Sequence, residues 1–392
     1  MTTENYILQN FDNTVRFRPN DEGRHIGIPE KYTVPCISGG FTEMFYWDTY
    51  FTNKGLILAG KTELAKSNCN NIAFMINKFG YMPNGSSLSF LGRSQPPFFA
   101  LMVKDVFEAT GDEKWLEVML KDIEKELNFW ETKRKGGQLN RYYGDYDDAT
   151  LEGFAKMVSG RIKIDQTRDL VEAGLDYIAE AESGWDFTGR FNGRCADYNA
   201  VDLNSLLYAA ESFLGEHAGY EKWKIKAQER KAKINEILFD EKQGVFIDYD
   251  FINAEFSSVK SCAGFMPYFV GAVEEKFAFG AKNLLKAVEE EFALSATEKT
   301  DNNYQWGYKN AWAPLHLITV VGLNNYGFNE DARRIAKKYV DIVDANFEKT
   351  GGLWEKYNAV TGGIDAVSEY GTPEMMGWTA GVYLYCKNFL EK

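Results

Sequence analysis

Apolar residues recur at helical spacing along most of this chain, and this pattern restricts its possible folds more than any other feature. One such apolar stripe is made by Ala65, Cys69, Ile72, Ile76 and Phe79. Steps of three and four residues place such side chains on one face of a helix. The same spacing recurs in 112–133, 202–215 and 329–347, and Asp112 stands where an N-cap is expected.

The whole chain reads as roughly a dozen helices joined by short polar loops. Further helices fit 44–59, 95–109, 166–180, 219–238, 275–291, 309–323 and 373–390. Strand-like alternation is sparse, and VFIDYD at 245–250 is one short candidate. We predict an irregular polar arm over residues 1–34 and one all-α domain over residues 35–392. Sequential helical hairpins can close into a double ring with a funnel, although a right-handed helical stack would show the same periodicity.

Composition argues against several classes of partner. The formal charge is −13, so neither nucleic acid nor an anionic membrane is expected to bind. No apolar run of about 18 residues occurs, so we predict no membrane span. Aromatic residues make up 15% of the chain, a surplus that suits a sugar-binding cleft as well as a large core.

Cysteines, histidines and the first residues of the chain predict a cytoplasmic protein without a metal site. The five cysteines are scattered and form no CxxC pair, which indicates reduced thiols. The opening MTTENYILQNFDN has neither a basic nor an apolar stretch, so we expect no signal peptide. The three histidines, His25, His217 and His316, have no neighbours at metal-ligand spacing.

Asp186, in the stretch ESGWDFTGRF at 182–191, is the first candidate for chemistry. Gly184 and Gly189 break any regular helix there, so the stretch is expected to be a tight loop. An acid against the indole of Trp185 would have a raised pKa and could hold a proton at neutral pH. The alternative is that Asp186 only caps the next helix.

Four other stretches also mix polar groups with aromatic rings. They are GGFTEMFYWDTYF at 39–51, MPNGSSLSFLGRSQPPFF at 82–99, NNYQWGYKNAWAP at 302–314, and GGLWEKYNAVTGG at 351–363 with the following SEYGTPEMMGW at 368–378. Taken singly, each could be a packed loop. Together they supply carboxylates, amides, an arginine and tryptophans without a phosphate-binding loop or a Ser-His pair. This set is suited to binding a sugar, and two carboxylates can share acid and base roles across a glycosidic bond.

These stretches resemble the trehalase family of glycoside hydrolases, in the family's order and from about residue 35 to residue 390. The segments that carry the resemblance are GGFTEMFYWDTYF, RSQPPFF, ESGWDFTGR, VDLNSLL, QWGYKNAWAP, EKY at 355–357, and EY followed by GWTAGV. The resemblance implies an (α/α)6 toroid that hydrolyses a small α-glucoside with inversion and without a cofactor, and trehalose is the leading substrate.

The resemblance also implies roles for individual residues. By motif position, Asp186 is similar to the family's general acid and Glu355 to its general base. Positions that line the family's glucose subsites correspond to Phe41, Trp47, Asp48, Asn84, Arg93, Gln95, Trp306 and Glu369, with Glu152 near a further family glutamate and Trp185 beside the acid.

Two family arginines of the substrate pocket are absent. Gly40 stands where the family has the arginine before Phe41, and Thr150 stands where it has another, two residues before Glu152. Gly307 also replaces an aspartate of the second family signature. The sequence therefore supports the reaction type better than the substrate.

Two rival hypotheses stay open. One keeps the fold and mechanism but takes another α-glucoside, such as kojibiose, nigerose or a glucosylglycerate. The other is a sugar-binding protein without catalysis, against which the presence of both carboxylates argues. The sequence does not give the oligomeric state.

Overall fold

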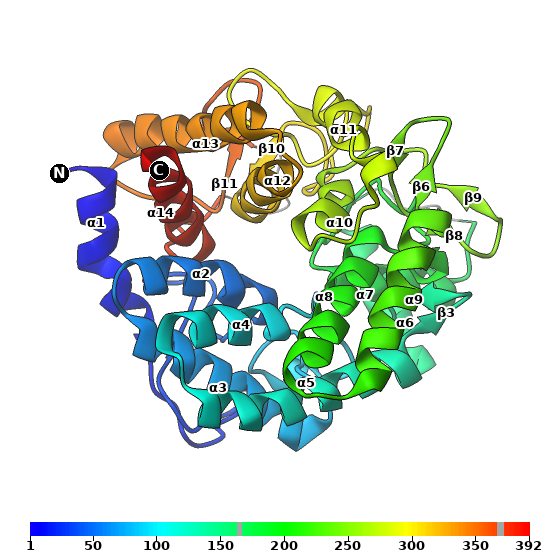
Figure 1. Cartoon of the computed structure of the whole chain (residues 1–392), viewed down its shortest axis with the longest axis horizontal. Helices are drawn as coiled ribbons and strands as arrows, with labels where there is room; N and C mark the ends of the chain where they lie inside the picture. The colour runs from blue at the N-terminus through cyan, green and yellow to red at the C-terminus, as the bar shows by residue number, and fades with distance from the viewer. Residues whose placement is uncertain (163–166, 367–371) are drawn as a thin grey trace.

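The chain forms a closed double ring of helices, shown face-on in Figure 1. The structure, a computed structural model, describes residues 1–162, 167–366 and 372–392. Its α-helices are α1 Thr3–Asn10, α2 Tyr46–Leu58, α3 Thr62–Phe79, α4 Phe99–Thr110, α5 Glu113–Lys133, α6 Asp148–Ser159, α7 Leu170–Ser183, α8 Val201–His217, α9 Glu221–Ile237, α10 Met266–Phe269, α11 Gly280–Val288, α12 Ala313–Asn325, α13 Asn329–Thr350 and α14 Gly377–Glu391. The predicted all-α (α/α)6 toroid is confirmed.

The inner ring consists of α2, α4, α8, α10, α12 and α14, each of which contacts the next. Helix α14 closes the ring against α2, so the two ends of the chain meet. Outside them lie α3, α5, α9, α11, α13 and α1. The helices α6 and α7 pack against each other as an additional hairpin.

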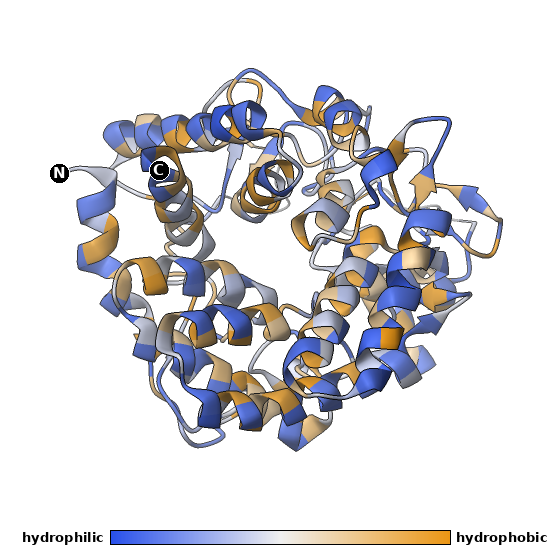
Figure 2. Ribbon diagram, in the orientation of Figure 1, coloured by the Kyte–Doolittle hydropathy of each residue, from blue (hydrophilic) through white to orange (hydrophobic). Residues whose placement is uncertain are grey.

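Burial explains the division into two rings. Helix α12 is apolar on nearly all sides and buries residues from Ala313 to Leu323, as expected of a helix covered on every face. Helix α9 buries only Trp223, Ala227, Ile234 and Asn235. Figure 2 shows hydrophilic and hydrophobic residues alternating along the outer helices, as expected of helices that are exposed on one side.

Local signals behave as the sequence predicts. Ala65, Cys69, Ile72 and Ile76 are fully buried on α3, which ends at Gly80 in the left-handed conformation. Asp112 caps α5, since its carboxylate accepts the Trp115 N–H at 3.1 Å.

The remaining regular structure consists of short antiparallel strands in the loops. The pairs are β1 Val15–Arg16 with β2 Tyr32–Thr33, β3 Lys135–Gly136 with β4 Leu139–Asn140, β6 Phe239–Asp240 with β7 Val245–Phe246, and β10 Asn310–Trp312 with β11 Lys356–Asn358, while β5 Tyr198–Asn199, β8 Tyr249–Asp250 and β9 Glu255–Phe256 form a three-stranded sheet. The predicted strand at 245–250 is two strands in different sheets, because β7 pairs with β6 whereas β8 pairs with β5 and β9.

The first residues differ from the predicted irregular arm. Helix α1 is capped by the Thr2 side chain, and Ile7 and Phe11 are fully buried in the main core. The same core cluster extends to Cys386 near the other end of the chain. Residues before 35 therefore contribute to the packing of the ring.

Closure of the ring depends on a close approach of α2 and α14, which we can test at Gly381. A Cβ added at Gly381 would lie 1.9 Å from the Phe51 carbonyl oxygen, so the helices must move apart to accept it. We expect Gly381→Ala to lower the free energy of unfolding by about 1–3 kcal/mol. In the matched control Gly153→Ala on α6, the new Cβ has no neighbour within 4 Å. That control is expected to gain roughly 0.5–1 kcal/mol from helix propensity.

Urea unfolding of both variants and the wild type measures the difference. Equal stability of the two variants would show that the contact between α2 and α14 tolerates a larger separation than the structure indicates.

Candidate active site

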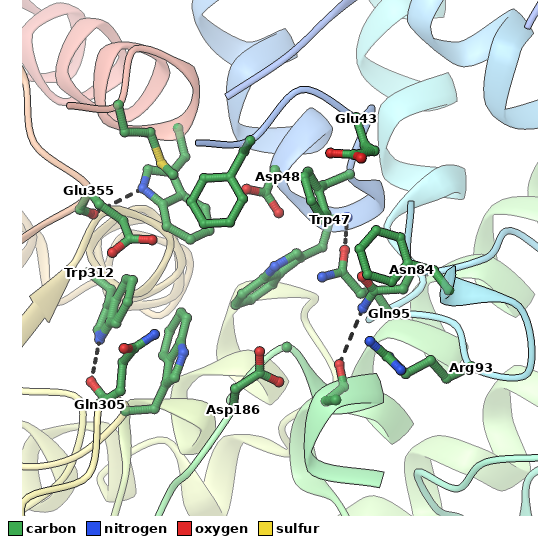
Figure 3. A pocket seen from close by; sticks show the side chains of 18 residues that line it. Glu43, Trp47, Asp48, Asn84, Arg93, Gln95, Asp186, Gln305, Trp312 and Glu355 are labelled. Carbon is green, nitrogen blue, oxygen red and sulfur yellow. Dashed lines mark hydrogen bonds between the residues drawn. The ribbon is translucent and has the colours of Figure 1, made fainter. Parts of the chain in front are cut away.

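A cavity of about 290 Å³ opens between the loops on one side of the ring. Figure 3 shows its side chains, which come from segments far apart in the sequence. Nine of the residues named from the sequence line it: Phe41, Trp47, Asp48, Asn84, Arg93, Gln95, Asp186, Trp306 and Glu355. The folded ring therefore brings five separate polar-aromatic stretches to one place.

Asp186 lies in the loop that follows α7, with its carboxyl group open to the cavity. Helix α7 ends at Gly184 in the left-handed conformation, and no helix among the described residues takes Asp186 as its cap. Asp186 is itself exposed within the open cavity, but the cavity walls displace much of the bulk water around it, and this desolvation raises the pKa of Asp186 to about 6. The positive charges of Arg93 and Arg161 oppose this increase in pKa, and the charge of Glu355 adds to it.

Backbone contacts fix the loop that carries Asp186. Phe187 adopts a positive φ of 59°, a conformation that non-glycine residues rarely take. The Phe187 carbonyl accepts the Trp306 N–H at 3.1 Å, and the Thr188 hydroxyl donates to the Trp306 carbonyl at 3.1 Å. The loop is thereby joined to the segment that supplies Trp306.

A buried ion network lies beneath this loop. Arg190 is fully buried, and its guanidinium donates to both Asp202 and Asp248 at 2.9–3.0 Å. The same guanidinium stacks 4.5 Å from the ring of Trp185, which in turn contacts Trp306 at 5.0 Å between centroids. Two carboxylates around one arginine satisfy charges that would be costly if buried alone. The network holds Trp185 under the cavity wall.

Glu355 comes from a segment near the C-terminal end of the chain, where it directly precedes β11, and its side chain lines the cavity. It is 2% exposed and forms an ion pair through Oε2 with Nζ of the buried Lys356. Its backbone carbonyl accepts the indole N–H of Trp378 at 3.1 Å. The ion pair does not remove Glu355 from the cavity, which its side chain still lines.

Asp48 is a third carboxyl group in the same cavity. It lies in the first turn of α2 and is 9% exposed. Burial raises the pKa of Asp48 to about 7, and the charges of Glu355 and Asp186 add to the effect. The raised pKa values of Asp48 and Asp186, together with the repulsion between their charges, therefore favour states in which one of these two groups is protonated.

Amide and guanidinium groups of the 84–95 loop form another wall. The Gln95 side-chain oxygen accepts a hydrogen bond from the Trp47 backbone N–H at 3.2 Å. The Asn84 side-chain amide donates to the Ala181 carbonyl at 3.3 Å. Arg93 donates to the Tyr146 hydroxyl at 3.4 Å. Its Nε is buried and has no hydrogen-bond partner among the described residues, so the guanidinium has donor capacity left for a ligand.

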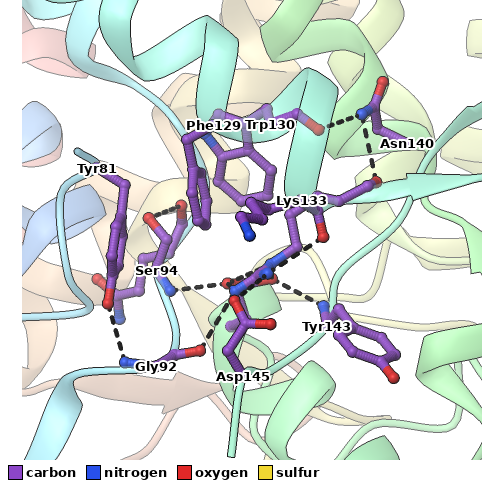
Figure 4. Close-up of polar contacts among 12 residues, drawn as sticks. Tyr81, Gly92, Ser94, Phe129, Trp130, Lys133, Asn140, Tyr143 and Asp145 are labelled. Carbon is purple, nitrogen blue, oxygen red and sulfur yellow. Dashed lines mark hydrogen bonds and ion pairs between the residues drawn. The ribbon is translucent and has the colours of Figure 1, made fainter. Parts of the chain in front are cut away.

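Figure 4 shows the contacts that attach this wall to α7. The buried Glu182 forms an ion pair with Arg134 and accepts backbone N–H groups from Ser94 and Tyr143, each at 2.8 Å. Arg134 also pairs with Asp145 at 2.9 Å. One carboxylate thus sets the 92–95 loop relative to the end of the helix that precedes Asp186.

Tryptophans provide the apolar surface of the cavity. Trp306 stacks on Trp312 with 3.9 Å between centroids and an interplanar angle of 3°. The rings of Trp47 and Trp378 pack against that of Trp306, with centroid separations of 5.5 and 6.3 Å. Flat rings beside amides and carboxylates are suited to binding the C–H face and the hydroxyl groups of a sugar.

Three predicted residues lie elsewhere or are not described. Trp185 is buried behind Trp306 and does not line the cavity. Glu152 lies on α6, forms an i,i+4 ion pair with Lys156 on a solvated face and is not among the residues that line the cavity, so its role in substrate binding stays a prediction. Glu369 falls outside the described residues.

The two positions where the family has arginines, Gly40 and Thr150, do not line the cavity. Gly40 follows Gly39, and both have positive φ, a conformation that disfavours any L side chain. Thr150 is exposed in the first turn of α6, where its N–H binds Asp147.

Sequence reasoning missed several lining residues, namely Glu43, Phe45, Phe90, Met375 and Trp378. Gln305 and Trp312, which also line the cavity, were recognised only as part of their stretch. Glu43, Phe45 and Trp378 stand inside the recognised motifs, where their position could have signalled them. Among the described residues, no three His, Cys, Asp or Glu side chains are placed to hold a metal ion. No described helix has both the length and the apolar character needed to cross a bilayer.

Comparison with known proteins finds one family that matches nearly the whole chain. The family described as Trehalase matches residues 8–391. The periplasmic trehalase of Salmonella choleraesuis (strain SC-B67) is 31% identical over 389 residues, which cover 91% of this chain and 68% of the relative. The periplasmic trehalase of Escherichia coli O17:K52:H18 gives the same identity and coverage.

Solved structures show the same ring. Neutral trehalase Nth1 from Saccharomyces cerevisiae has a TM-score of 0.79 at 25% identity, over 99% of this chain and 80% of that one. A GH63 mannosylglycerate hydrolase from Thermus thermophilus has a TM-score of 0.67 at 16% identity, over 97% and 99% of the two chains. At that identity the second likeness shows the fold alone.

The relatives contradict the predicted cytoplasmic location, because several of them are periplasmic trehalases. The prediction rested partly on unpaired cysteines. All five are buried and free, and burial raises the pKa of Cys36 to about 11. Buried thiols react poorly, so their unpaired state does not report the compartment.

Asp48 allows a direct test of the cavity's electrostatics. Its folded pKa of about 7 exceeds the ordinary 3.8, so ionisation destabilises the native state increasingly between pH 4 and pH 7. We expect Asp48→Asn to match the wild type in stability below pH 4. At pH 8 the variant should be more stable by a few kcal/mol. Urea unfolding across this pH range measures the difference, and a constant difference at all pH values would contradict the buried charge.

Proposed function

Because this chain belongs to the trehalase family, we propose that it is an inverting glycoside hydrolase that cleaves trehalose into two glucose molecules. We further propose that residues 35–392 form its single catalytic domain, against which the preceding residues pack through Ile7 and Phe11. The observation that carries the proposal is that Asp186 and Glu355, 169 positions apart in the sequence (355 − 186), line one cavity. Inverting hydrolysis needs two such carboxyl groups on opposite sides of the scissile bond.

Asp186 acts as the general acid in this proposal. Its pKa of about 6 lets it hold a proton near neutral pH and transfer it to the glycosidic oxygen as the bond breaks. Asp186 leaves this step as a carboxylate, which Arg93 stabilises through its charge. The protonated oxygen departs as a hydroxyl group of the first glucose.

Glu355 acts as the general base. It accepts a proton from water while the water oxygen forms a bond to the anomeric carbon, on the face opposite to the leaving group. The two carboxyl groups must then stand about 6.5–9.5 Å apart, so that the water fits between them. The proton on Glu355 returns to Asp186 through solvent, which completes the cycle.

The remaining polar groups hold the sugar. Asn84, Arg93 and Gln95 offer donors and acceptors on one wall, and Asp48 offers a carboxyl group on another. Trp306, backed by Trp312, provides a flat surface for one sugar ring. Each of these groups can act on the hydroxyl pattern of glucose without taking part in proton transfer.

One observation favours a different α-glucoside as the alternative substrate. Gly40 and Thr150 lie outside the cavity, so of the three family arginines only Arg93 lines it. A protein of the same fold is named as a mannosylglycerate hydrolase, so we include other glycosides among the candidate substrates. Hydrolysis of trehalose, kojibiose, nigerose and glucosylglycerate, measured side by side, decides the substrate. We expect trehalose to have the highest kcat/KM, and cleavage of another compound alone would overturn the assignment.

Removal of either carboxyl group tests the mechanism. We expect Asp186→Asn and Glu355→Gln each to lower kcat at least about 10²–10⁴-fold, because each loses one proton transfer. Glucose binding, measured by calorimetry, should stay within a few-fold of the wild type. Glu152→Gln is the matched control, since that carboxylate pairs with Lys156 outside the cavity.

Wild-type activity in either cavity variant would rule out the assigned role of that residue. Loss of activity in the Glu152 variant would show that the exposed face of α6 takes part in the reaction.

A further inference from the structure

Lys356, directly after Glu355, is a fully buried cation that the mechanism above does not use. Its Nζ forms an ion pair with Oε2 of Glu355, and the two side chains are 0% and 2% exposed. Lysine is rarely buried completely unless it is paired. The ammonium group does not line the cavity, so its contact with the reaction runs through its neighbours.

The strand register explains how Lys356 reaches this position. In the pairing of β10 with β11, Lys356 stands opposite Trp312, and cross-strand partners lie within contact distance. The Lys356 Nζ lies 4.7 Å from the centroid of the Trp312 ring. Lys356 is the first residue of β11 and Glu355 directly precedes the strand, so the ammonium group contacts both its chain neighbour and its cross-strand partner.

Trp312 connects this cation to the sugar-binding surface. Its ring stacks flat against Trp306 at 3.9 Å, and its indole N–H donates to the Gln305 carbonyl at 3.2 Å. One ammonium group therefore contacts both the base and the ring that supports the sugar platform. A shift of Lys356 would change the position of Glu355 relative to Trp306.

We propose that Lys356 is a positioning residue that holds the carboxylate of Glu355 in place relative to the Trp306–Trp312 platform. The inference rests on the proposed function, in which Glu355 is the base. The ion pair restrains Oε2, and the contact with Trp312 fixes where the ammonium group itself lies. Lys356 also places a positive charge beside Glu355 in a cavity whose lining contains three other acidic residues, Glu43, Asp48 and Asp186.

Other charged and titratable groups lie close enough to interact electrostatically with Glu355. Asp48 from α2 and Asp186 from the loop after α7 both interact electrostatically with Glu355. The charges of Glu355, Asp48 and Glu374 each contribute to raising the pKa of the Cys36 thiol. On the Asp186 side of the cavity, Arg93 and Arg161 contribute positive charge, and Glu43 is a further acidic residue of the lining. Replacement of Lys356 by a neutral residue removes the positive charge of the ion pair with Glu355.

The test compares trehalose hydrolysis by Lys356→Met and the wild type across pH. We expect kcat to fall about 10²-fold, since a base displaced by about 1 Å reacts poorly, with KM changed less than about threefold. Without the neighbouring cation, the acidic limb of kcat/KM should move to higher pH. A residue with a merely structural role would leave that limb in place.

Lys54→Met is a matched control. Lys54 also combines an ion pair, at 2.7 Å to Asp105, with a cation–π contact, at 5.2 Å to Tyr50. Neither partner lines the cavity, so the pH profile should match that of the wild type. If Lys356→Met does not fold, Lys356→Arg takes its place. The planar guanidinium cannot occupy the same point, and we expect kcat to fall about tenfold with the acidic limb unmoved.

An unchanged acidic limb and kcat in Lys356→Met, or a wild-type kcat in Lys356→Arg, would overturn the inference. Failure of the proposed function is distinguishable, because Glu355→Gln would then keep its activity. If Glu355→Gln is inactive while Lys356→Met behaves like the wild type, only the positioning role is wrong.

Discussion

The contact between α14 and α2 is the constraint on which the rest of the structure depends. Gly55 on α2 and Gly381 on α14 approach so closely that a side chain on either would meet the other backbone. This approach closes the ring and brings Asp48, near the start of the chain, into the same cavity as Glu355, near its end. An open helical stack of the same sequence would separate these residues. The chemistry therefore depends on ring closure before it depends on any single side chain.

Once the ring is closed, several acidic side chains lie together in one cavity, with the cation Arg93 in its lining. Burial raises the pKa of Asp186 to about 6 and that of Asp48 to about 7. Rigid ion networks outside the cavity keep these groups in place. Arg190 with Asp202 and Asp248 supports Trp185, and Glu182 with Arg134 supports the 92–95 loop. Such an arrangement lowers stability at the site itself and is tolerated because the surrounding contacts are well satisfied.

The sequence predicted much of the fold because burial on one face leaves a strong periodic signal. The stripe of α3 and the cap of α5 are examples. Helix α1 was missed because it has only eight residues and buries few of them, and α6 was missed because its face contacts only a small satellite core. The strands have two or three residues each, too few to show alternation.

The candidate site was predictable to a similar degree, through its motifs. Nine residues of the cavity could be named because motif order fixes their position. The place of Glu152 could not, since its pairing with Lys156 depends on where α6 lies. Trp185 was adjacent to Asp186 in sequence, but the tight loop turns its ring to Arg190 behind the cavity. The ion pair of Lys356 with Glu355 depends on strand register, which sequence periodicity did not reveal.

Proton NMR of the anomers released during the first turnovers of trehalose cleavage tests the central claim most directly. Two carboxyl groups on opposite sides of the scissile bond predict that β-glucose appears together with an equal amount of α-glucose, before mutarotation mixes them. Inversion at the attacked carbon produces the β-anomer, and the leaving glucose keeps its α-configuration. Release of α-glucose alone would show retention and contradict the account.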